Sequence, residues 1–142
     1  SAVDPAAPGA RAVVTLLSAA EAAQSGDAAA AADQLDALAA NGEVDQVYRD
    51  LAAFKALLYR ADTADAATRR LGFEGLAQPG NPLRVLAEEQ LALLDVAEGE
   101  ADAAIERLER LRADAEATAG LRRRAAQLIV ALGGVPAALA DG

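Results

Sequence analysis

The 142-residue sequence contains no Cys and no His. The absence of Cys excludes disulfide bonds and thiol nucleophiles, and the absence of His removes the commonest general base and the usual zinc ligand. Aromatic residues make up only 3% of the chain, and Trp and Met are missing altogether. Because there is no Met and the first residue is Ser1, we expect an N-terminal segment to precede the chain, with a signal or membrane anchor as the natural candidate.

The chain is also poor in positive charge, with a formal net charge of −9. This disfavours binding to nucleic acid and to anionic lipid, because phosphate contacts need a basic surface. The longest uncharged stretch, residues 125–140, is interrupted by Gly133-Gly134 and Pro136, and it is shorter than the roughly 20 residues that span a bilayer. We therefore expect membrane attachment only through the preceding segment.

The 22 acidic residues form no recognisable catalytic or metal-binding pattern. Glu88 and Glu89 are adjacent, so they point in different directions from one helix, and Asp62-x-x-Asp65 lacks the ligand register of a Ca²⁺-binding loop. We therefore predict no catalytic residue, no metal site and no cofactor, and we expect that the protein is not an enzyme. An enzyme or ligand-binding bundle is the alternative, and it would require a deep pocket with convergent polar groups.

What the sequence has in abundance is Ala, at more than a quarter of all positions, together with Leu, Arg, Glu and Gln. These residues lose least on entering a helix, so the composition predicts an all-α fold. Apolar residues recur at three-to-four spacing between turns rich in Gly, Asn, Asp and Pro. The pattern predicts seven helices, which run from Ala10 to Ser25-Gly26, from Asp27 to Asn41-Gly42, from Asp45 to Asp62, and over about 64–77, 82–98, 100–114 and 118–132.

Three local features add detail to these helices. Val13, Val14, Leu16 and Leu17, together with Ala20, form one apolar face of the first helix, which could seek a partner surface. Asp45 is the expected N-cap of the third helix. Asn81 is the expected N-cap of the fifth, with Pro82 at its first position, where a missing N–H costs nothing.

The helices recur in pairs. Apolar residues follow Gly26 and Gly99 at the same offsets of five, nine and twelve residues. They are Ala31, Leu35 and Leu38 after Gly26, and Ala104, Leu108 and Leu111 after Gly99. The two glycines lie 73 residues apart, or two periods of about 36, and Asp62 lies halfway between them, with Ala67 and Leu71 at the first two offsets. Upstream, Leu17, Phe54 and Leu91 recur at steps of 37, as do Ala20, Leu57 and Leu94.

A period near 34 residues is typical of tetratricopeptide repeats, whose helix pairs bury their apolar faces by stacking on their neighbours. The sequence therefore predicts a tetratricopeptide-like right-handed solenoid of about three helical hairpins plus a C-terminal capping helix. Residues 10–134 would form this repeat domain, residues 1–9 an N-terminal linker, and residues 135–142 a C-terminal tail that frays after Pro136.

Residues 47–133 resemble the tetratricopeptide-like periplasmic domain of ancillary subunits of the bacterial Sec translocon. The resemblance rests on Tyr48-Arg49-x-Leu51-Ala52, Leu76-Ala77-x-Pro79-Gly80-Asn81-Pro82-x-Arg84, Glu88 to Leu94 followed by Glu98-Gly99-Glu100, and Leu121-Arg122-x-Arg124-Ala125 with the closing Leu132-Gly133. It implies a domain on the periplasmic side of the inner membrane, anchored by an N-terminal segment. The implied partners are the channel, periplasmic chaperones and emerging proteins.

In a tetratricopeptide stack, the first helix of each pair lines a concave surface that binds proteins. The polar, aromatic and apolar residues expected to bind a partner there are Arg49, Tyr59, Leu86, Glu89 and Leu93. Tyr59 could instead pack between hairpins, and Arg49 and Arg84 could pair with acids such as Asp45 and Glu88. A generic tetratricopeptide scaffold in cell-envelope assembly, with a different partner, is the alternative function.

Overall fold

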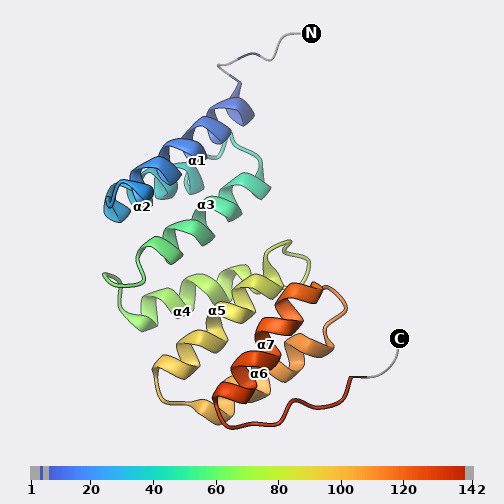
Figure 1. Ribbon diagram of the computed structural model, residues 1–142. Coiled ribbons are helices and arrows are strands. Elements are labelled where there is room, and N and C mark those ends of the chain that lie inside the picture. The colour runs from blue at the N-terminus through green and yellow to red at the C-terminus, as the bar shows by residue number, and fades with distance from the viewer. Residues whose placement is uncertain (1–3, 5–6, 140–142) are drawn as a thin grey trace. The chain divides into compact units, whose positions relative to one another are not determined.

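The computed structural model of the chain describes residue 4 and residues 7–139, and within them it contains seven α-helices and no strand. The helices are α1 (Pro8–Gln24), α2 (Ala28–Ala39), α3 (Gln46–Tyr59), α4 (Ala66–Leu76), α5 (Arg84–Ala97), α6 (Ala101–Ala113) and α7 (Ala119–Ala131). Figure 1 shows how each helix follows the previous one through a short connection. The all-α prediction is confirmed. No described helix has both the length and the hydropathy needed to span a bilayer.

The chain divides into two compact units, and the division falls within α4, after Gly72. In the first unit, α2 packs against both α1 and α3 (Figure 1). Arg60, next to the end of α3, pairs with two carboxylates of α2, Asp33 at 2.9 Å and Asp36 at 2.5 Å. The core of this unit is built mostly from small side chains: Ala12, Ala19, Ala31, Leu35, Leu38, Val44, Ala52 and Ala56.

In the second unit, α6 is the middle helix and packs against both α5 and α7. Its core is larger in side-chain volume, with Val85, Ala92, Leu108, Leu111, Ala117, Leu121, Ala125 and Ile129 buried together. After α7 the chain turns back at Gly133, whose φ of 87° is a conformation that glycine adopts without strain. The next residues lie against α6, where Ala137 donates to Glu109 and accepts from Arg112, each at 2.9 Å. The tail is therefore held at Ala137 and does not fray directly after Pro136.

Side-chain caps fix three helix starts. Asp27, Asp65 and Thr118 accept hydrogen bonds from backbone N–H groups at the starts of α2, α4 and α7. The bond from Thr68 lowers the pKa of Asp65. Asp45 is the N-cap residue of α3, as predicted, although its side chain makes no cap hydrogen bond. The cap prediction was wrong at Asn81, which accepts from the N–H of Leu83 at 2.9 Å and forms a turn, so that α5 begins only at Arg84.

In α1 the small residues are buried, and most of the large apolar residues are exposed. Its buried residues are Ala12 and Ala19, with Leu16 partly buried beside them. Val13, Val14 and Leu17 are exposed by 44%, 64% and 66%. The larger apolar side chains thus lie outside, because small Ala residues let α1 approach α2 closely.

Burial confirms the internal repeat at its two ends and corrects its middle. Ala31, Leu35 and Leu38 of α2 are buried, as are their counterparts Ala104, Leu108 and Leu111 of α6. In α4, however, the predicted counterpart Leu71 is 70% exposed, and Phe73 and Leu76 are buried instead.

The step is therefore 38 residues from Leu35 to Phe73 and 35 residues from Phe73 to Leu108. The physical reason is the connection between α3 and α4, which has six residues, against three before α2 and three before α6. The winding of these helix pairs into a right-handed solenoid stays a prediction.

Candidate protein-binding groove

A groove of about 480 Å³ lies between α5 and α7 of the second unit. Leu108 of α6, which is fully buried, belongs to its lining. The other lining residues are Glu89 and Leu93 of α5, and Arg124, Ala125, Gln127, Leu128 and Ala131 of α7. α6 packs against both flanking helices, and the groove is the space between α5 and α7 above Leu108 of α6.

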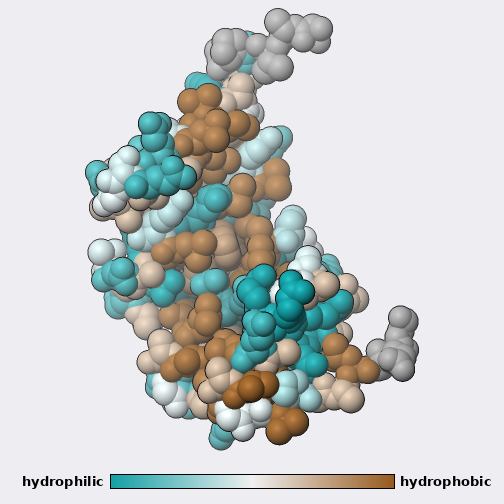
Figure 2. All heavy atoms as spheres, viewed as in Figure 1, coloured by the Kyte–Doolittle hydropathy of each residue, from teal (hydrophilic) through white to brown (hydrophobic). Residues whose placement is uncertain are grey.

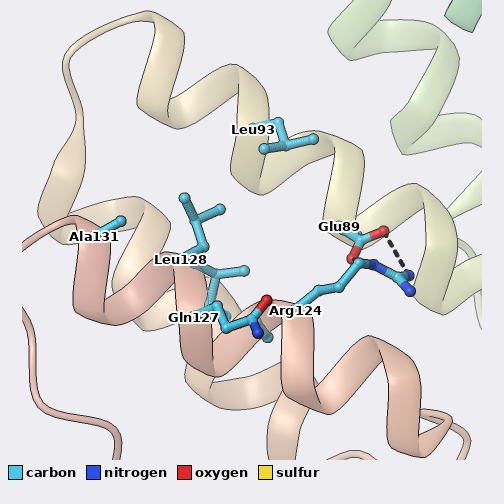
Figure 3. A pocket seen from close by; sticks show the side chains of 8 residues that line it. Glu89, Leu93, Arg124, Gln127, Leu128 and Ala131 are labelled. Atoms are coloured by element: carbon cyan, nitrogen blue, oxygen red, sulfur yellow. Dashed lines mark hydrogen bonds and ion pairs between the residues drawn. The ribbon is translucent and has the colours of Figure 1, made fainter.

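Both flanking helices run past the groove in the same direction. In Figure 3, Glu89 and Arg124 lie at one end, Leu93 and Leu128 in the middle, and Ala131 at the other end. Glu89 and Arg124 are 35 residues apart in the sequence, and so are Leu93 and Leu128. This is the same step as that from Phe73 to Leu108, so the groove faces equivalent positions of successive repeats.

The polar end of the groove is closed by a two-pronged ion pair. Arg124 donates from Nε and Nη2 to the two carboxylate oxygens of Glu89, at 2.9 and 3.0 Å (Figure 3). The Glu89 side chain is only 15% exposed, whereas that of Arg124 is 53% exposed. These hydrogen bonds to Glu89 raise the pKa of the Arg124 guanidinium above its ordinary value. One end of the groove is therefore polar and the remainder is apolar.

The helices around the groove are fixed by two further ion-pair networks. Arg107 of α6 donates to Asp95 at 3.0 Å and to Glu88 at 2.7 Å, both on α5. Burial alone would lower the pKa of Arg107, but the hydrogen bonds to Glu88 and Asp95 outweigh it and raise that pKa. Asp95 is 5% exposed, so this network ties α5 to α6 inside the unit.

The second network is anchored by Arg84, at the start of α5. Its guanidinium pairs with Asp114 at 2.8 Å and with Glu116, both in the connection before α7. The Arg84 hydrogen bond lowers the pKa of Asp114 below its ordinary value of 3.8. The start of α5 is thereby joined to the segment that leads into α7, and the two walls of the groove are held by charge-assisted bonds.

The groove offers binding surface and little chemistry. Its two charged lining residues neutralise each other, and Gln127 is its one other polar side chain. Among the described residues, no group of three or more carboxylates is placed to hold a metal ion. The groove can bury apolar side chains of a partner, and the Glu89–Arg124 pair limits the apolar surface at one end of it.

The residues predicted from the sequence divide between the two units. Glu89 and Leu93 line the groove, and Leu86, one turn earlier on α5, packs partly buried on the core of the second unit. Arg49 and Tyr59 lie on α3 in the first unit.

Tyr59 packs partly buried against the core of the first unit. The guanidinium of Arg49 donates to Gln46 at 2.7 Å, while its Nε is buried without a hydrogen-bond partner. Arg84 does pair with acids, as the alternative proposed, but these are Asp114 and Glu116 and not Glu88, whereas Arg49 bonds to Gln46 and not to Asp45.

The sequence prediction missed the α7 wall of the groove, namely Arg124, Gln127, Leu128 and Ala131. It treated α7 as a cap, because three hairpins appeared to be complete without it. The signal was nevertheless present, since Arg124 and Leu128 follow Glu89 and Leu93 at one repeat length.

No protein-family model matches the chain, and no curated protein or solved structure is significantly similar to it.

Proposed function

We propose that this chain is a non-catalytic protein-binding module and that its groove between α5 and α7 receives the apolar face of an amphipathic helix from a partner protein. The observation that supports this is the groove itself, an apolar channel between two helices that run in the same direction. Leu93, on its α5 wall, is 42% exposed. Covering an exposed leucine in a concave apolar site removes apolar surface from water, and this contributes favourably to the free energy of binding.

A helix suits the groove better than a small polar ligand. A volume of about 480 Å³ is within the usual range for binding sites. The lining, however, lacks the several convergent polar groups that orient a small molecule. A helix would lay apolar side chains at i, i+3, i+4 and i+7 along the channel, as in other helix-in-groove complexes.

The resemblance to the periplasmic domain of ancillary Sec translocon subunits supports a cellular setting for this binding. In that setting the chain would be held at the inner membrane by an N-terminal anchor, with the translocon channel, periplasmic chaperones or emerging proteins as partners. The alternative is a tetratricopeptide scaffold in cell-envelope assembly with another partner. Both readings use the same groove and differ in what occupies it.

Binding by the groove can be tested with a defined probe. The probe is an 18-residue peptide that is neutral overall and carries a leucine stripe at helical spacing. Nuclear magnetic resonance titration of the ¹⁵N-labelled chain should shift the amide signals of Leu93, Gln127 and Leu128. Leu93→Glu should weaken binding by at least about tenfold, because the charge would lose its water inside an apolar channel.

The matched control is Val130→Glu. Val130 lies on α7, the helix of the opposite wall, and is 61% exposed, but it does not line the groove. This variant should bind the peptide as the parent chain does. Equal weakening by both variants, or signal shifts confined to residues away from the groove lining, would refute the groove as the binding site.

The cellular setting needs a separate experiment. A photoreactive amino acid is placed at Leu93 in the full-length protein and crosslinked in living cells, with position 130 as the control. Adducts with translocon or periplasmic chaperone subunits, specific to position 93, are the expected result. Position-93 adducts with envelope-assembly proteins alone would favour the alternative, and adducts with cytosolic proteins alone would refute both settings.

A further inference from the structure

The outward side of α1 carries an apolar stripe that no described part of the chain covers. Figure 2 shows hydrophobic side chains gathered over the N-terminal half of α1. Val14 and Leu17 are exposed by 64% and 66%. At 100° per residue they lie on the side of the helix opposite to Ala12 and Ala19, which are buried in the first unit.

The stripe has the spacing of a helix–helix seam. Ala10, Val14, Leu17, Glu21 and Gln24 follow one another at steps of four, three, four and three residues. This alternation places every member on one face, as in a coiled coil. Val13, which is 44% exposed, widens the stripe on one side.

We propose that α1 pairs with α1 of a second copy of this chain, in an antiparallel arrangement about a two-fold axis. The axis would pass between Val14 and Leu17, so that each Val14 contacts the partner's Leu17 and each Glu21 lies beside the partner's Ala10 and Arg11. An isologous contact of this kind closes after two copies, so the product is a dimer and not a filament.

Charge favours a second copy in this orientation. Arg11 and Glu21 are the charged residues of α1, one near each end. Antiparallel pairing brings them together twice, whereas parallel pairing would set Glu21 against Glu21. The present partner of Arg11 is Glu43, at 3.6 Å, and both side chains are more than half exposed, so this pair competes weakly.

The N-terminus of α1 adds to this complementarity. Its first turn contains no acidic residue, and the N-cap residue Ala7 offers no side-chain hydrogen bond. The partner's Glu21 would lie near this first turn, where a negative charge is stabilised by the helix dipole.

The dimer is expected to be weak and concentration-dependent. One crossing pair of 17-residue helices buries less surface than the roughly 1,200 Å² at which stable interfaces begin. A dissociation constant on the order of 10 to 100 μM is the corresponding expectation. The dimer does not depend on the proposed groove, because α1 lies in the first unit and the groove in the second.

Sedimentation equilibrium of the 142-residue chain between about 5 and 500 μM tests the proposal. Leu17→Glu should leave a monomer at every concentration, since it places charge in the centre of the seam. Leu17 is exposed, so the variant should fold, as circular dichroism will verify. Leu71→Glu, at a site that is 70% exposed on α4, is the matched control and should dimerise like the parent.

A charge exchange tests the orientation. Glu21→Arg should weaken the dimer by about tenfold, since the altered contact occurs twice. Arg11→Glu combined with Glu21→Arg should restore the affinity to within about threefold of the parent. A parent chain that stays monomeric up to 500 μM, a dimer that survives Leu17→Glu, or a double exchange that does not restore association would each overturn the proposal.

Discussion

The two glycines of α4, Gly72 and Gly75, differ in what surrounds them. A Cβ added at Gly72 would lie 2.7 Å from both Cδ atoms of Leu57, well inside ordinary van der Waals contact. A Cβ added at Gly75 would have no atom within 4 Å. Neither glycine has a positive φ, so alanine fits the backbone at both sites.

The structure therefore predicts different effects for the two alanine variants. Alanine is favoured over glycine inside a helix by about 0.5–1 kcal/mol, and this gain applies to both positions. At Gly72 the side chain of Leu57 must also move, and overpacking of this kind costs about 1–3 kcal/mol. Gly75→Ala should therefore stabilise the protein, and Gly72→Ala should be neutral or destabilise it by up to about 2 kcal/mol.

The difference in unfolding free energy between the two variants is the more precise test, because the gain in helix propensity is common to both and cancels. It should equal the overpacking cost, about 1–3 kcal/mol. Urea denaturation followed by circular dichroism measures it, with equal slopes for the two variants as the check on two-state unfolding. In the background of Leu57→Ala, the penalty at position 72 should disappear. If Gly72→Ala stabilised the parent as much as Gly75→Ala did, the close approach of α4 to Leu57 would be wrong.

Three further predictions follow from the hydrogen bonds of the second unit. Arg107→Leu should destabilise the protein by about 3 kcal/mol in urea denaturation, because it leaves the buried Asp95 carboxylate without its guanidinium. The lowered pKa of Asp114 in the folded state stabilises the protein above about pH 4, and this contribution is lost as pH falls through the folded pKa. Stability curves of the parent and of Arg84→Gln should therefore converge in acid. Thr118→Ala removes the cap of α7 and should cost about 1 kcal/mol in thermal or urea unfolding.

Each of these has a clear contrary result. A stability loss below about 0.5 kcal/mol for Arg107→Leu would place that side chain at a solvated surface, where ion pairs contribute little. If the difference in unfolding free energy between the parent and Arg84→Gln stayed constant from neutral pH into acid, Arg84 would not be lowering the pKa of Asp114. Thr118→Ser keeps the hydroxyl and should retain most of the stability that Thr118→Ala loses.

The number and order of the helices could be predicted because they depend on local chemistry. Abundant Ala and Leu favour helix throughout, and Gly26, Gly99 and Gly133 end helices with positive φ angles that other residues rarely adopt. The starts were less predictable. The side chain of Asn81 can either cap a helix or close a turn. Here it accepts from the N–H of Leu83 and closes a turn.

Part of the candidate groove could also be predicted from the sequence. Glu89 and Leu93 were expected on a binding face because of their place in the repeat, and both line the groove. The opposite wall was missed because, within the described residues, no helix follows α7 to complete a hairpin. The signal for this wall was the 35-residue step from Glu89 to Arg124.

The sequence by itself determined that the chain is all helical, where most helices end, and which residues of α2 and α6 are buried. Those features follow from propensity, turn glycines and three-to-four spacing. Tertiary structure decided which face of α1 is inward, because a helix rich in Ala is apolar on several sides and periodicity cannot choose among them. It also decided the register of α4, where a longer connection brings Phe73 inward in place of Leu71, and it opened the groove by setting α6 between α5 and α7.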